Sequence, residues 1–300
     1  MTQVAESKKV GEVLSTAKLP VSVILAVRNE ARNLPRCLQG LKDFAEVIVV
    51  DSQSADDTVE IARSHGAQVV QFHYRGGWPK KRQWAMDILP IANDWILLLD
   101  ADEVVTPELL EEMRTAITDP SVDGYAIRLN TRFLGGSLRF GDVALWKSCL
   151  FRRGKGRYEC RLQDQDLSMA DMEVHEHVMV QGVVKKLRQP LKHHNAESLS
   201  HYIRKHDEYS NWESRMLLQP GNERALPPAL FGSQAQRRRW LKLKLFSLPG
   251  SPVLLFLYRY VFCFGFLDGI PGLIYCAFQG VQMFHTKAKI YELKRKSKQA

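Results

Sequence analysis

Three carboxylates stand within four residues directly after a short apolar run, and they are the clearest candidates for chemistry in this chain. Residues 95–99 are an unbroken run of five apolar residues, a pattern typical of a strand buried on both faces of a parallel sheet. Asp100, Asp102 and Glu103 follow it. Like charges this close repel each other, and a divalent metal carrying a phosphorylated ligand is a common counter-charge. The alternative is a solvated acidic turn that merely ends the strand.

The segments before these acids alternate between two patterns. Apolar, β-rich runs at 20–27, 46–50, 67–72 and 94–99 are separated by helical patterns that begin near residues 33, 54 and 80. Such alternation predicts a parallel sheet with right-handed crossovers, as in an α/β nucleotide-binding half-domain. A further helix is expected to begin at Pro107 with Thr106 as its N-cap.

Acidic side chains close three of the four predicted strands. Glu30 follows the first, Asp51 ends the second, and Asp100 and Asp102 follow the fourth. Ligands of open α/β sheets bind at the carboxyl ends of the strands. Carboxylates there can accept hydrogen bonds from a base or a ribose and can hold a metal, which suits a nucleoside diphosphate. The glycine-rich fingerprints of dinucleotide oxidoreductases and P-loop NTPases do not follow the first strand, so the sequence argues against both classes.

Three motifs follow one another along the chain: Val-Ser-Val-Ile-Leu-Ala-Val-Arg-Asn-Glu at 21–30, Ile-Val-Val-Asp-Ser-Gln-Ser-Ala-Asp-Asp-Thr at 48–58 and Leu-Leu-Leu-Asp-Ala-Asp-Glu at 97–103. In this order they resemble the motifs of family 2 glycosyltransferases of the GT-A fold. The resemblance implies an α/β fold with a Rossmann-like, mostly parallel sheet. It also implies a transferase that uses a nucleotide-sugar donor and inverts the anomeric centre.

The resemblance assigns roles to single residues. Asp51 resembles the acid that reads the base, Asp100 the acid that contacts the nucleoside, and Asp102 the main metal ligand on the diphosphate. A weaker match places three loop residues beside the nucleoside: Arg28, Asn29 and Glu30.

A basic helix start precedes the acidic motif and resembles the one in these enzymes. Lys81 and Arg82 would neutralise the diphosphate there; the alternative is that they belong to a solvated helix start. Gln83 stands where close relatives are expected to carry Asn, so the contact that this side chain makes in the family is expected to differ here.

Inverting transfer is a single displacement that needs one base for the acceptor hydroxyl and a Lewis acid for the departing diphosphate. Residues 173–177, Glu-Val-His-Glu-His, resemble a segment of lipopolysaccharide-core and exopolysaccharide members. This favours Glu176 as the base, with Asp171 and Glu173 as alternatives. His175 and His177 would share a face on a strand, so a metal role for them stays open.

A histidine near residue 193 resembles the distal metal or diphosphate ligand of GT-A enzymes. Spacing to the following helix, expected from Ser198, favours His193 over His194. The alternative is a loop histidine that caps this helix. With Asp102, His193 would hold Mg²⁺ or Mn²⁺ as the cofactor.

The C-terminal segment carries the basic charge. Residues 232–300 hold twelve Lys or Arg and two acids, a net +10 against +9 for the whole chain. Residues 252–284 are very apolar but are interrupted by Arg259, Asp268 and Pro271, and only 16 residues separate Asp268 from His285. This is short of the ~20 needed to span a bilayer, so interfacial helices or a shallow hairpin on a membrane surface are expected. A packed helical subdomain or a dimer interface is the alternative, and nucleic acid is a poor partner because the aromatics do not form a stacking groove.

These patterns divide the chain into a polar tail (1–18), a GT-A catalytic domain (19–230) and a basic, apolar helical segment (231–300). Five cysteines without Cys-x-x-Cys spacing fit a reducing compartment, and the polar start carries no secretory signal. We therefore expect the protein at the cytoplasmic face of the inner or plasma membrane.

The sequence thus predicts an inverting glycosyltransferase of envelope polysaccharide or lipopolysaccharide synthesis. The expected donor is a nucleotide sugar, with a UDP-sugar favoured, and the expected acceptor is a lipid-linked glycan. The alternatives are a nucleotidyltransferase on a similar sheet and a non-catalytic membrane scaffold that binds sugar nucleotides.

Overall fold

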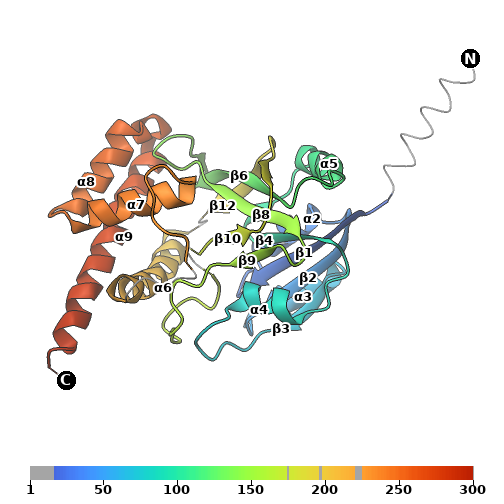
Figure 1. The fold of residues 1–300 in the computed structure, drawn as a ribbon, viewed down its shortest axis with the longest axis horizontal. Helices are drawn as coiled ribbons and strands as arrows, with labels where there is room; N and C mark the ends of the chain where they lie inside the picture. The colour runs from blue at the N-terminus through green and yellow to red at the C-terminus, as the bar shows by residue number, and fades with distance from the viewer. Residues whose placement is uncertain (1–16, 174–175, 196–197, 220–224, 300) are drawn as a thin grey trace, which may run out of the picture.

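The computed structural model describes residues 17–173, 176–195, 198–219 and 225–299. Within them the strands form one ten-stranded sheet, with β3-β2-β1-β4-β8-β6-β12-β5 as its main path, and a separate two-stranded sheet. Figure 1 shows the sheet in the half of the molecule nearer the N-terminus, with the last three helices gathered at the other end.

The N-terminal half is a parallel α/β unit, as predicted. Its strands are β1 (Leu19–Val27), β2 (Phe44–Asp51), β3 (Gln68–Gln71) and β4 (Trp95–Asp100), joined by α2 (Leu34–Gln39), α3 (Thr58–Ser64) and α4 (Lys81–Ile88). Nearly every residue of β1 and β4 is buried, because helices cover both faces of a parallel sheet. Thr106 caps α5 (Pro107–Ala116), as predicted, since its hydroxyl accepts from the Leu109 N–H.

The second half adds mixed strands to the same sheet. β8 (Trp146–Arg152) runs antiparallel to β4, and β6 (Gly124–Phe133) runs antiparallel to β8. β12 (Leu191–Asn195) then lies between β6 and the short β5 (Glu103–Val104). Smaller strands complete this half: β7 (Gly136–Ser137), β11 (Val184–Lys186) and the pair β9 (Gly156–Tyr158) and β10 (Val178–Val180). Because β5 directly follows the acidic motif, β12 delivers its histidines to that motif.

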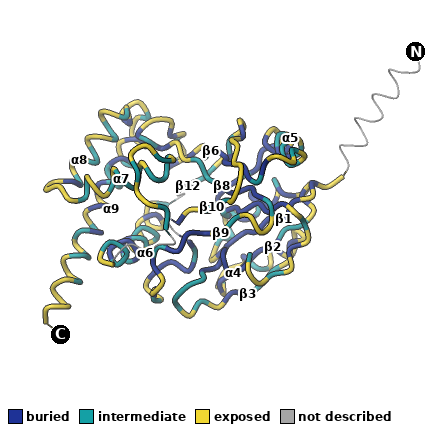
Figure 2. The backbone as a smooth tube through the Cα atoms, in the orientation of Figure 1, coloured by how far each residue is buried: buried dark blue, intermediate teal, exposed yellow. Residues whose placement is uncertain are grey.

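The C-terminal part is helical. It comprises α6 (Leu199–Leu218), α7 (Gln234–Ser247), α8 (Ser251–Leu257), a π turn (Tyr258–Phe262), a 3₁₀ turn (Gly265–Asp268) and α9 (Gly269–Lys296). α9 packs on both α6 and α8. Gly280 permits a close crossing, since a Cβ there would lie 2.7 Å from the Pro252 carbonyl oxygen. Figure 2 shows exposed stretches along α8 and the end of α9, whereas the sheet is mostly buried.

No helix in the described part of the chain is by itself long and apolar enough to cross a membrane. One bent pair, Ser251–Phe262 with Gly265–Lys296, meets the length and composition criteria together and is bent by 73°.

Candidate active site

The strand register brings the acids of the sequence motifs to one edge of the sheet. Asp51 of β2 pairs with Val27 of β1, and Asp100 of β4 pairs with the neighbouring Ala26. The predicted strand ends therefore meet at the carboxyl edge, as parallel pairing requires.

The Asp51 carboxylate is fully buried and held by three hydrogen bonds. It accepts from the Ser54 N–H at 3.0 Å, the Ser54 hydroxyl at 2.5 Å and the Gln71 side-chain amide at 3.0 Å. Asn29 braces the same loop, because its side-chain oxygen accepts from the Ala55 N–H at 2.8 Å. The protein's own groups therefore orient the Asp51 carboxylate.

Asp100 sits between two cations. Its carboxylate accepts from the Arg82 guanidinium and, at 3.2 Å, from the Lys147 ammonium. Burial acts to raise the pKa of Asp100, but Arg82 and Lys147 outweigh it and hold that pKa well below its usual range. The Glu103 carboxylate contacts the same groups. It accepts hydrogen bonds from the Lys147 ammonium at 2.7 Å and from the Asp100 N–H.

Asp102 and His193 form a pair across β5 and β12. The His193 Nε2 atom lies 3.4 Å from the Asp102 carboxylate. Burial acts to raise the pKa of Asp102, yet His193 lowers it to about 2, and Asp102 in turn raises the pKa of His193 against the effect of burial. The two residues that the sequence predicted as metal ligands are therefore neighbours.

The donor set at this pair fits a divalent cation. A carboxylate oxygen and an imidazole nitrogen are accepted ligand types for Mn²⁺ and can serve Mg²⁺ when phosphate oxygens complete the shell. The Nδ1 atom of His193 is buried and has no hydrogen-bond partner among the described residues. Within those residues no group of three or more His, Cys, Asp or Glu could hold a metal, so the remaining ligands would have to come from a bound nucleotide and water.

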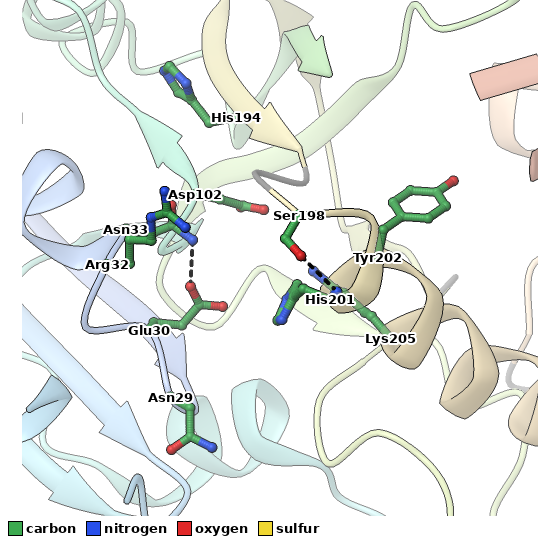
Figure 3. A pocket seen from close by; sticks show the side chains of 10 residues that line it. All are labelled: Asn29, Glu30, Arg32, Asn33, Asp102, His194, Ser198, His201, Tyr202 and Lys205. Carbon is green, nitrogen blue, oxygen red and sulfur yellow. Dashed lines mark hydrogen bonds between the residues drawn. The ribbon is translucent and has the colours of Figure 1, made fainter. Parts of the chain in front are cut away.

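A pocket opens beside this pair, between the N-terminal half and α6 (Figure 3). One wall comes from the β1–α2 loop and the acidic motif, and the other from β12, α6 and its cap. The lining residues are Asn29, Glu30, Arg32, Asn33 and Asp102 on the first side, and His194, Ser198, His201, Tyr202 and Lys205 on the second.

Glu30 is the second acid in this pocket. The Asn33 side-chain amide donates to its carboxylate at 2.9 Å. Burial nevertheless raises the pKa of Glu30 to about 7, with Asp102 adding to the rise. Arg28, the first residue of the predicted nucleoside loop, is exposed. Burial raises the pKa of Glu208 on α6, and the positive charge of Arg28 acts to lower it.

Lys81 and Arg82 are buried, so the alternative of a solvated helix start is wrong. The Lys81 ammonium donates to the Val27 carbonyl at 2.7 Å and lies 3.2 Å from Asp171. Arg82 bonds Asp100 and the Glu173 carbonyl. The diphosphate contact that the sequence predicted for both stays a prediction, and in this conformation protein groups already hold them.

The three candidate bases have different environments. Glu173 caps α4, because its carboxylate accepts the N–H groups of Arg82 and Gln83 at 3.2 and 2.8 Å. Asp171 pairs with Lys81. Glu176 is buried 4.0 Å from the Lys80 ammonium, and burial raises its pKa to about 8 although Lys80 opposes the rise. His175, the possible metal partner of His177, lies outside the described residues.

Two lysines of the site were not predicted as donor-site residues; Lys205 opens the segment 205–210, which resembles an acceptor-side helix of the family. Lys147 on β8 reaches Asp100 and Glu103 only because β8 inserts next to β4. Lys205 on α6 lines the pocket opposite Glu30. Neither position is marked by spacing along the chain, since both depend on tertiary pairing.

A sequence model of the family described as glycosyl transferase family 2 matches residues 22–178, slightly more than half of the chain. Among curated proteins, the lipopolysaccharide core biosynthesis glycosyltransferase LpsC of Rhizobium meliloti is 28% identical over 285 residues, which covers 92% of this chain and 93% of that protein. A glycosyltransferase of Rickettsia typhi is 27% identical and covers 93% and 89%.

Among solved structures, this chain is similar to glucosyl-3-phosphoglycerate synthase from Mycobacterium tuberculosis in complex with Mn²⁺, UDP and glucosyl-3-phosphoglycerate. The TM-score is 0.32 at 20% identity, and the match covers 40% of this chain and 46% of that one. The likeness therefore spans less than half of either protein.

Proposed function

Because this chain belongs to glycosyltransferase family 2 and has its GT-A fold, we propose that it moves a sugar from a nucleotide-sugar donor to a hydroxyl of a lipid-linked glycan. The step would belong to envelope polysaccharide or lipopolysaccharide synthesis; the relative LpsC, which matches 92% of this chain, is named for lipopolysaccharide core biosynthesis. The observation that carries the proposal is the Asp102–His193 pair at the strand edge that also bears Asp51 and Asp100.

The donor would lie along this edge of the sheet, with its base at Asp51 and its diphosphate at the Asp102–His193 pair. Asp51, already oriented by Ser54 and Gln71, would accept from the base. A UDP-sugar suits this contact because uracil has an imide N–H, which cytosine lacks. Asp102 and His193 would hold Mg²⁺ or Mn²⁺, which would supply positive charge to the diphosphate as a Lewis acid.

Glu176 is the base that we propose. A general base should have a pKa near the working pH, and burial places that of Glu176 at about 8. Glu173 is occupied as the cap of α4 and Asp171 is paired with Lys81. Glu176 would take the proton from the acceptor hydroxyl as that oxygen attacks the anomeric carbon.

Nucleotide binding is the first test of the proposed function. We expect one of UDP, GDP, CMP and dTDP, with UDP favoured, to stabilise the protein against heat, and to do so more strongly with Mn²⁺ present. A ligand at 100 times its Kd adds about 2.7 kcal/mol to the free energy of unfolding, which a thermal shift resolves easily. If none of the nucleotides changes the melting temperature with or without Mn²⁺, the proposed function is wrong.

The site of action that we propose is the cytoplasmic face of the membrane, and the apolar segment 253–270 supports the contact with a membrane. Ten of its large apolar residues are exposed: Val253, Leu254, Leu257, Tyr258, Val261, Phe262, Phe264, Phe266, Leu267 and Ile270. The two charges in this segment turn toward the protein. Asp268 accepts the N–H groups of Arg139 and Phe140, and Arg259 donates to the Gly141 carbonyl at 3.3 Å.

The outer face of 253–270 is therefore free of charge, although the sequence is interrupted by Arg259 and Asp268. Exposed cations lie on the helices that precede and follow this segment in the sequence, among them Arg237 and Lys244 on α7 and Lys294 and Arg295 on α9. An apolar segment between basic helices suits the interface of a bilayer with anionic headgroups. We propose that this face inserts into the headgroup region and holds the pocket near a lipid-linked acceptor.

Vesicle flotation tests this membrane contact. The double variant Phe262→Glu/Ile270→Glu replaces two side chains that are each 73% exposed. We expect it to bind vesicles with 30% anionic lipid at least about 100-fold more weakly, because burying one such side chain is worth about 1.5–3 kcal/mol. Ile88→Glu on α4, at a position that is 64% exposed, is the matched control. Equal binding by all three proteins would contradict the proposed membrane contact.

A further inference from the structure

We propose that Lys205 of α6 binds the phosphate next to the sugar and counters the charge left on that phosphate when the sugar departs. This inference rests on the proposed function and adds a donor-site residue to it. Lys205 comes from the half of the chain that follows the donor motifs, and it would close the diphosphate site from the opposite wall.

The position of Lys205 follows from the start of α6. Ser198 caps this helix, since its hydroxyl accepts from the His201 N–H at 3.4 Å. Ser198, His201, Tyr202 and Lys205 are spaced so that they share one helix face, and all four line the pocket. Figure 3 shows this helix face across the pocket from Glu30 and Asp102. A cation on α6 thus lies across the pocket from Asp102.

The charges around Lys205 explain why a cation is needed at this point. Tyr209 is the largest influence that raises the pKa of Lys205; burial opposes the rise, and Asp102, Asp100 and Glu30 add to it. The Lys205 ammonium also donates a hydrogen bond to the Tyr209 hydroxyl. Lys205 therefore stays charged and is partly buried in the pocket that Asp102, the acid proposed to hold the metal, also lines.

The sequence candidates for the diphosphate contact are less available. Lys81 is held by the Val27 carbonyl and Asp171, and Arg82 by Asp100 and Glu173. Lys205 and Arg32 both line the pocket. Burial acts to raise the pKa of Asp100 and of Asp102, and Lys205 is among the charges that lower the pKa of both acids.

The transfer step itself adds charge where Lys205 lies. The bond between the anomeric carbon and the phosphate oxygen breaks, and its electron pair stays on the phosphate. A bond from the acceptor oxygen to the anomeric carbon forms, and the acceptor proton goes to the base. The leaving nucleoside diphosphate therefore gains one negative charge, and a fixed cation beside it stabilises the transition state more than the bound donor.

Calorimetry with a matched pair of nucleotides tests the role of Lys205. The probes are the nucleoside diphosphate and the nucleoside monophosphate that carry the base identified by the thermal-shift test. They are UDP and UMP if that base is uracil, and each is measured with Mn²⁺. We expect Lys205→Met to weaken the diphosphate about 10- to 100-fold, the range of a hydrogen bond between charged groups, and to leave the monophosphate unchanged. Lys205→Arg should keep most of the affinity, and Arg204→Met, at the exposed neighbouring position, should match the wild type.

Other outcomes overturn the inference. If Lys205 is only a counter-ion of the acids, Lys205→Met will bind Mn²⁺ more tightly and will not lose affinity for the diphosphate. An unchanged ratio of diphosphate to monophosphate affinity, in Lys205→Met or in Lys205→Gln if the first variant does not fold, also refutes the role. In both cases wild-type nucleotide binding leaves the proposed function standing, whereas a wild-type protein that binds no nucleotide refutes the function and the inference together.

Discussion

Replacing Asp102 by Asn is expected to remove the Mn²⁺-dependent part of nucleotide stabilisation and to lower turnover about 10²- to 10³-fold. The Asn side chain has nearly the same shape but is neutral, so the metal pair loses its only carboxylate and keeps the His193 imidazole. A bound metal contributes several kcal/mol to stabilising charge in a transition state, and each 1.36 kcal/mol is a factor of ten in rate. The measurements are the thermal shift with nucleotide and Mn²⁺ and the initial rate of sugar transfer.

A matched control is available for the Asp102 variant. Asp94→Asn removes the same charge at an exposed position just before β4 and should behave as the wild type. Because Asp102 is buried beside His193, the melting temperature of each free variant must be measured first, and the effect of nucleotide is read as the shift from that value. A full metal-dependent shift in Asp102→Asn would show that the cation binds elsewhere.

Replacing Glu176 by Gln is expected to lower kcat about 10²- to 10⁴-fold and to leave nucleotide affinity within a factor of two or three. This is the range that a positioned general base contributes, and Gln keeps the volume of the side chain without its basicity. Nucleotide affinity should survive because the predicted nucleoside contacts lie at Asp51 and Asp100. A non-catalytic scaffold would lose nothing in this variant, so the result also separates the enzyme from that alternative.

The pH dependence adds a second signature for Glu176. A general base must be ionised, and burial raises the pKa of this carboxyl to about 8. The value of kcat/KM should therefore rise with pH toward a plateau above about 8 in the wild type, and this rise should be missing in Glu176→Gln. Glu30 has a raised pKa of about 7 and lines the pocket. If Glu30→Gln loses turnover and Glu176→Gln keeps it, the base is Glu30.

The parallel half of the fold could be predicted from the sequence. The apolar runs, the caps and the acids at strand ends are local signals, and each predicted strand and helix from β1 to α5 is present within a few residues. The meeting of Asp51 and Asp100 at one edge follows from parallel pairing alone. The proximity of His193 to Asp102, which only the resemblance suggested, required β12 to enter the sheet beside β5.

Burial was the property that the sequence left open. One alternative for Lys81 and Arg82 was a solvated helix start, yet tertiary contacts with residues 171–173 bury both. Arg259 and Asp268 looked like interruptions of an apolar segment, yet they turn inward onto the loop between β7 and β8. In each case a charge is satisfied by a partner far along the chain, and no local pattern identifies such a partner.

The sequence by itself determined the alternation of strands and helices along the N-terminal half, the acids at the strand ends and the family that these motifs indicate. The reason is that hydrophobic period and strand-end chemistry are encoded locally. Only the tertiary structure decided which charges face one another. It placed Lys147 and Lys205 beside the acidic motif and left the face of 253–270 without charge. The physical reason is that the free energy of a buried or paired charge depends on its neighbours in space, and these neighbours come together only when the chain folds.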